Sequence, residues 1–134
     1  MKKELGDENF SQIKNISEPV AAASIAQVHF ANIIFNGKSK NIALKILRPN
    51  IEKIFNEELD ALMLLAYLIQ VLIKKTERLK LIEVVQLLRE ITNVEMDLRF
   101  EAAAANELYE NTKNDIGFQV PKIYWNQTSK RILC

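Results

Sequence analysis

The stretch Pro19-Val-Ala-Ala-Ala-Ser-Ile-Ala-Gln-Val-His-Phe-Ala31 decides the fold that we expect, because it begins as a run of very small side chains and ends as a strand. Side chains this small let a ligand or another backbone approach the main chain closely, a role more often given to glycine. Alanine resists positive φ, so this loop should be stiffer than a glycine loop. The loop residues that we expect to bind a ligand are Ala22, Ala23, Ser24, Ile25 and Ala26.

A β-hairpin is predicted to follow the small-residue loop. Branched and aromatic side chains after Ile25 favour a strand, and Asn36-Gly37 is a typical hairpin turn. In the returning strand, from Ile42 to Leu47, alternation places Ala43 and Lys45 on one face. A ligand between that face and the loop would contact Lys45. The order strand, small-residue loop, strand, turn and strand with Ala-x-Lys is the layout of a protein-kinase nucleotide lobe, in which the lysine binds the α- and β-phosphates.

Two long helices are expected after the lysine strand. Pro49 ends that strand, and Asn50 can cap a helix from about Ile51 to Lys75. A second helical pattern begins near Leu79 and leads to Glu101 and four consecutive alanines, which would let the segment lie close to another backbone.

The last part of the chain is predicted to leave the helix and return to the sheet. Asn114-Asp-Ile-Gly117 is interpreted as a helix stop rather than as a kinase metal motif, because glycine commonly ends a helix. A strand is then expected from Val120 to Trp125, a turn after it, and the start of another strand from Lys130 to Leu133.

Composition excludes several classes of protein. The 134 residues, 49% of them hydrophobic, suffice for one core and one domain. A net charge of +1 gives no electrostatic footprint for nucleic acid, so we expect no such partner. With one cysteine, Cys134, and one histidine, His29, neither a disulfide framework nor a His-rich zinc site is expected. No secretory signal is visible, and the apolar run from Ala61 to Ile69 is too short to span a bilayer, so we expect a cytoplasmic location.

Four segments in this order resemble one known family, the UbiB family of atypical kinase-like ATPases associated with ubiquinone biosynthesis. They are Ala21 to His29, Ala43 to Pro49, Glu95 to Ala103 and Val120 to Trp125. The resemblance implies an α+β fold: a protein-kinase-like small lobe with an antiparallel sheet and two long helices, truncated before the large lobe. We expect one lobe over residues 1–134, with an N-terminal segment at 1–17, the Ala-rich loop and strands at 18–48, helices at 50–114 and strands at 119–134.

The resemblance also implies roles for particular residues. Glu101 would be the helix partner that holds Lys45 against phosphate, so that both are candidate catalytic residues, with Ala43 lining the cofactor site. The alternative is that Glu101 is an ordinary solvated glutamate. Glu95 and Asp97 match the family's Glu-x-Asp motif, whose carboxylates engage the lysine of a Lys-x-Gly-Gln motif that is absent here. Glu95 could instead pair with Arg99, four residues later.

The implied cofactors are ATP and Mg²⁺, with the metal ligands expected outside this chain and none assigned within it. Neither a His-Arg-Asp catalytic loop nor a genuine Asp-Phe-Gly motif is found, so a separate chain could supply the large lobe. For the full-length family the implied partners are a lipid or quinone precursor and the inner face of a membrane. Two hypotheses stay open: a fragment of a UbiB-like kinase or ATPase that binds ATP phosphates, and a non-catalytic interaction module or decayed remnant. Peripheral membrane association through the helices is a third.

Overall fold

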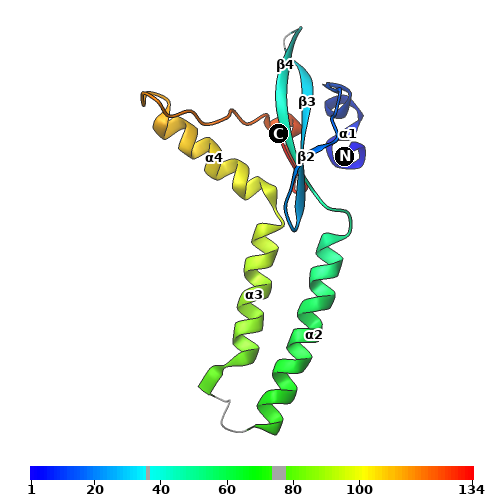
Figure 1. Ribbon diagram of the computed structural model, residues 1–134, viewed down its shortest axis with the longest axis vertical. Coiled ribbons are helices and arrows are strands. Elements are labelled where there is room, and N and C mark those ends of the chain that lie inside the picture. Colours follow the sequence, from blue (N-terminus) through cyan, green and yellow to red (C-terminus); the bar gives the residue numbers. More distant parts are fainter. Residues whose placement is uncertain (36, 74–77) are drawn as a thin grey trace. The chain divides into compact units, whose positions relative to one another are not determined.

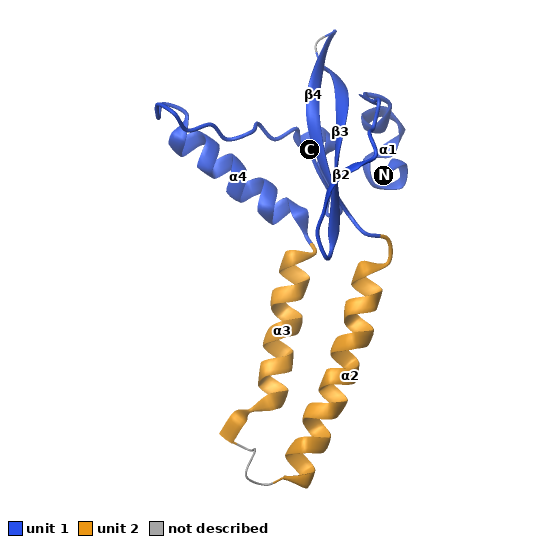
Figure 2. Cartoon of the chain, viewed as in Figure 1, with its two compact units in different colours: residues 1–48, 97–134 blue, residues 49–96 orange. Residues whose placement is uncertain are grey.

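The computed structural model describes residues 1–35, 37–73 and 78–134. Asn36 of the predicted turn and the end of the first predicted helix, Lys75, therefore lie outside the described residues. The chain forms two compact units (Figure 2). Unit 1 contains Met1–Arg48 and Asp97–Cys134, and unit 2 contains Pro49–Met96.

Unit 1 is built on an antiparallel sheet of five strands, which confirms the predicted α+β class. The strand order is β1-β3-β4-β5, and β2 also pairs with β3. The long strands β3 and β4 form the centre of the sheet, and α1 lies beside it (Figure 1). The elements of this unit are α1 Lys2–Ser11, β1 Ile13–Lys14, β2 Pro19–Ala22, β3 Ala26–Phe35, β4 Lys38–Leu47, α4 Leu98–Thr112, the 3-10 helix η2 Trp125–Gln127 and β5 Ile132–Leu133.

One face of this sheet carries the hydrophobic core of unit 1. Alternation along the strands brings Ile33 of β3 and Leu44 of β4 to this face, and neither side chain is exposed. Leu5 from α1 and Ile132 from β5 pack with them. Full burial of one such side chain contributes about 1.5–3 kcal/mol. The opposite face therefore holds the side chains that alternate with these, including Lys45.

Unit 2 is a pair of packed helices, α2 Ile51–Leu72 and α3 Leu81–Glu95. Leu59, Ala66 and Val85 form its small buried core. Asp60 and Arg89 join the two helices through an ion pair of 2.6 Å. Many large apolar side chains on both helices stay exposed. Within the described residues, no helix combines the length and the apolar character that crossing a bilayer requires.

The sequence pattern suggests one continuous second helical region. The structure instead divides it into two helices, α3 and α4. The break lies at Asp97, whose backbone is extended and whose carboxylate accepts a hydrogen bond from the Arg99 N–H. Aspartate at this position favours a new helix start over continuation. Asn50 does precede α2, but its side chain makes no capping hydrogen bond.

The strand predicted from Val120 to Trp125 is wrong. Residues 118–124 form no strand, and the 3-10 helix η2 begins at Trp125. Pro121 lacks the N–H that a strand ladder needs, which accounts for the difference. The helix stop is confirmed, since α4 ends at Thr112, and the strand start near Lys130 is confirmed by β5.

Candidate functional site

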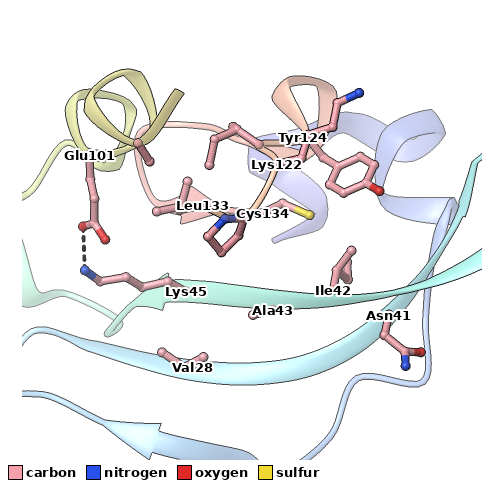
Figure 3. A pocket seen from close by; sticks show the side chains of 13 residues that line it. Val28, Asn41, Ile42, Ala43, Lys45, Glu101, Lys122, Tyr124, Leu133 and Cys134 are labelled. Atoms are coloured by element: carbon pink, nitrogen blue, oxygen red, sulfur yellow. Dashed lines mark hydrogen bonds and ion pairs between the residues drawn. The ribbon is translucent and has the colours of Figure 1, made fainter. Parts of the chain in front are cut away.

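A pocket of about 550 Å³ opens beside β4 in unit 1 (Figure 3). Its floor comes from β3 and β4, and its walls come from α4, residues 121–124 and the end of the chain at β5. Apolar side chains make up most of the lining, and Lys45 and Glu101 stand together at one end (Figure 3). A concave site of this size, mostly apolar with a few convergent polar groups, is typical of small-molecule binding.

The Lys45 ammonium lies 2.6 Å from a carboxylate oxygen of Glu101, measured from Nζ to Oε2. Lys45 is held in the middle of the sheet, because its strand neighbours are Val28 on β3 and Leu133 on β5. Glu101 stands in the first turn of α4. The two residues are 56 positions apart, so only tertiary packing brings them together.

Two features of α4 bring Glu101 to the sheet. The Leu98 N–H donates a 2.9 Å hydrogen bond to the Lys130 carbonyl, which ties the start of the helix to the chain just before β5. Ala102 is completely buried, so the small side chain lets the helix backbone approach its neighbours closely. Of the alanine run after Glu101, Ala102 therefore serves the close approach that the sequence predicts.

The Lys45–Glu101 pair is accessible to solvent. The Lys45 side chain is 31% exposed and that of Glu101 is 48% exposed. Solvent screening limits such pairs to about 0.2–1 kcal/mol of stability. The pair can therefore fix the position of an ammonium group in an open cleft, where an anionic ligand can reach it.

The other predicted site residues divide into two groups. Ala43 lines the pocket together with Lys45 and Glu101. Residues 22–26 do not belong to its lining; they form the β2–β3 connection and its strand ends. The structure thus brings Lys45, Glu101 and Ala43 together, and the catalytic and cofactor-binding roles of all these residues stay predictions.

Several lining residues were missed from the sequence. Val28 could have been found, because it faces Lys45 across the β3–β4 pair and alternation puts both on one face. Tyr124 and Cys134 gave no local signal. They lie in the wall because the Tyr124 N–H donates a 2.9 Å hydrogen bond to the Cys134 carbonyl, which joins two irregular segments.

Cys134 is a buried thiol in this wall. Loss of solvent around the sulfur raises the pKa of Cys134 to about 12. At neutral pH the group is therefore a neutral thiol, and it adds a small apolar surface to the pocket.

The two motif carboxylates lie in different surroundings. Asp97 accepts two hydrogen bonds from the Arg99 guanidinium, at 2.9 and 2.6 Å. These side-chain hydrogen bonds lower the pKa of Asp97 below its usual value. The alternative pairing of Arg99 with Glu95 is wrong, since Arg99 binds Asp97 instead, and Glu95 is the exposed last residue of α3.

Among residues 1–35, 37–73 and 78–134, no group of three or more histidine, cysteine, aspartate or glutamate side chains is arranged to hold a metal ion.

Comparison with known proteins gives one consistent result. The model of the ABC1 atypical kinase-like domain matches residues 1–134. Three similar proteins are each called "Probable protein kinase UbiB". The protein from Marinobacter nauticus is 37% identical over 116 residues, which cover 87% of this chain and 21% of the relative. The protein from Aeromonas hydrophila is 35% identical over 115 residues (86% of this chain, 21% of the relative), and that from Azotobacter vinelandii is 33% identical over 127 residues (95% of this chain, 23% of the relative). The chain spans about a fifth of the length of these curated relatives. Because the domain model covers the whole chain, this protein belongs to the ABC1 atypical kinase-like family.

Proposed function

We propose that this chain binds the phosphates of ATP, as the small lobe of a UbiB-like atypical kinase or ATPase that acts in ubiquinone biosynthesis. The observation that carries the proposal is the 2.6 Å contact between Lys45 and Glu101 at one end of a pocket. In kinases, such a pair holds a lysine ammonium against the α- and β-phosphates. Family membership supports the same assignment.

The rest of the pocket suits the remainder of a nucleotide. The volume of about 550 Å³ is within the range of sites that enclose small molecules. Val28, Ala43 and Leu133 provide apolar surface next to Lys45, against which a flat heterocyclic base can pack. The nucleotide would thus bind with its phosphates at the Lys45 ammonium and its base against this apolar surface.

The proposal is tested by calorimetric titration of the chain with ATP and Mg²⁺. Lys45→Ala should raise the dissociation constant at least about tenfold, since it removes the ammonium group that we assign to the phosphates. The matched control is Lys40→Ala on the same strand, because the Lys40 ammonium lies over the ring of Phe35, 5.7 Å from its centroid, and is not part of the pocket lining.

Both variants should keep the circular dichroism spectrum of the parent chain. Equal ATP affinity for the parent and a folded Lys45→Ala variant would count against the nucleotide assignment. Loss of affinity in Lys40→Ala as well would indicate a general charge effect instead of a phosphate site.

For the whole protein, we propose phosphoryl transfer or ATP hydrolysis at the inner face of a membrane, with a lipid or quinone precursor as partner. This part of the proposal rests on the family alone, because the chain represents about a fifth of its relatives.

A second candidate function is an interaction module without nucleotide binding. The observation in its favour is the exposed apolar surface of unit 2, where Leu64 is 61% and Leu72 is 77% exposed. Large contiguous apolar patches on a protein surface mark interaction sites. The same titration separates the two functions, since a folded chain that binds no ATP would support the module.

A further inference from the structure

Arg48, directly after β4, is hydrogen-bonded to the small-residue loop of residues 23–25. Its Nε donates a 3.2 Å hydrogen bond to the Ala23 carbonyl, and its backbone N–H donates a 2.9 Å hydrogen bond to the Ile25 carbonyl. Arg48 is itself anchored, because the guanidinium of Arg131 donates to the Arg48 carbonyl at 3.0 Å. A single residue therefore fixes two of the three loop carbonyls.

These contacts determine where a loop N–H group points. The peptide between Ala23 and Ser24 is trans, as are all described peptide bonds, so its C=O and N–H point in opposite directions. Because the Ala23 carbonyl is turned toward Arg48, the Ser24 N–H is turned away from it. Neither the Ser24 N–H nor the Ile25 N–H donates a hydrogen bond to any residue that the structure describes.

Free neighbouring backbone N–H groups in a loop of small side chains are suited to an anion. Phosphate-binding loops commonly use backbone N–H donors that no internal acceptor occupies. Here alanine makes the loop stiff but does not by itself select the orientation of the peptide plane. The hydrogen bond from Arg48 provides that selection.

We propose that Arg48 is a positioning residue, which orients the peptide between Ala23 and Ser24 so that the Ser24 N–H can donate to a phosphate group of the nucleotide. The inference rests on the proposed function and adds a residue to it. Arg48 acts through the loop and does not itself contact the nucleotide.

The experiment compares Arg48→Met with the parent chain by titration with ATP and with adenosine. Methionine keeps an unbranched side chain but has no donor, so ATP affinity should fall about tenfold, the usual effect of losing one charge-assisted hydrogen bond. Adenosine affinity should not change, because adenosine has no phosphate. Lys40→Met, which removes an exposed charge from β4, the strand that precedes Arg48, should bind both ligands like the parent chain.

A spectroscopic measurement separates positioning from general destabilisation. In the parent chain, ATP should shift the Ser24 amide resonance in a ¹H–¹⁵N spectrum, and adenosine should not. Arg48→Met should abolish this shift. If Arg48→Met does not fold, Arg48→Lys keeps the charge without the planar guanidinium, and a several-fold loss of ATP affinity with a reduced Ser24 shift is expected.

The outcomes distinguish this inference from the proposed function. Unchanged ATP affinity and an unchanged Ser24 shift in the folded variant would overturn the role of Arg48, and so would equal losses for ATP and adenosine. If Lys45→Ala weakens ATP binding while Arg48→Met does not, the nucleotide site stands and the positioning role fails. If the parent chain binds no ATP, both fail.

Discussion

Replacing Glu101 with glutamine removes the negative charge next to Lys45 while preserving the length of the side chain. From the structure we expect a small loss of folding free energy and a larger loss of ATP affinity. The pair is short, 2.6 Å, but its side chains are 31% and 48% exposed, so its loss should cost only about 0.2–1 kcal/mol of folding free energy. For a chain of this size, that is a decrease in melting temperature of no more than about 5 °C.

The effect on nucleotide binding should be larger. Without the carboxylate, the Lys45 ammonium is free to leave the position in which it meets the phosphates, and ATP affinity should fall about tenfold, or about 1.4 kcal/mol. Differential scanning fluorimetry measures the first quantity and calorimetric titration with ATP the second. Glu107→Gln is the matched control, because Glu107 is exposed on the same helix and does not line the pocket.

Two results would refute this reasoning. A large loss of stability in Glu101→Gln with little change in ATP affinity would mean that the pair is a structural contact. Identical ATP affinities for Glu101→Gln and Glu107→Gln would mean that the carboxylate does not act on the nucleotide.

Three further predictions concern the fold around the site. Ile33→Val should lower the free energy of unfolding by about 0.5–1.5 kcal/mol in a urea titration, because Ile33 is fully buried, whereas Ile34→Val, at a position 47% exposed, should change it little. Asp97→Ala should destabilise the chain by about 0.5–2 kcal/mol at pH 7 through loss of the α4 cap. Since the pKa of Asp97 is lowered in the folded chain, its stabilisation is present above about pH 4 and disappears as the pH falls further, so melts of the two proteins should converge in acid. Cys134 should react with iodoacetamide at pH 8 on the order of a thousandfold more slowly in the folded chain than in urea. The reason is that a pKa of about 12 leaves almost no thiolate in the folded chain. Equal rates in the two conditions would contradict the burial of Cys134.

Local patterns predicted the parts of the site that lie on regular strands and helices. Alternation along β4 places Ala43 and Lys45 on one face, opposite the buried Leu44, and this follows from the strand period alone. The contact with Glu101 was anticipated from the family resemblance together with the alanine run, which signals a close approach of the helix.

Features that depend on long-range packing could not be predicted in this way. The pocket wall at Tyr124 and Cys134 is formed by a hydrogen bond between irregular segments, which has no periodic signal. The break between α3 and α4 could not be predicted from periodicity, because apolar residues continue at helical spacing across Asp97. The one local signal for the break is that aspartate is a favoured N-cap. Nor does helical periodicity tell which helices pack together, so the separate unit of α2 and α3 was not foreseen.

The most direct test of the central claim is a ¹H–¹⁵N spectrum of the chain recorded during titration with ATP and Mg²⁺. The account predicts saturable shifts for the backbone amides of Val28, Ala43 and Lys45, which line the pocket, and none for Val85 in the core of unit 2. A spectrum that does not change, or saturable shifts confined to residues outside the pocket, would contradict it.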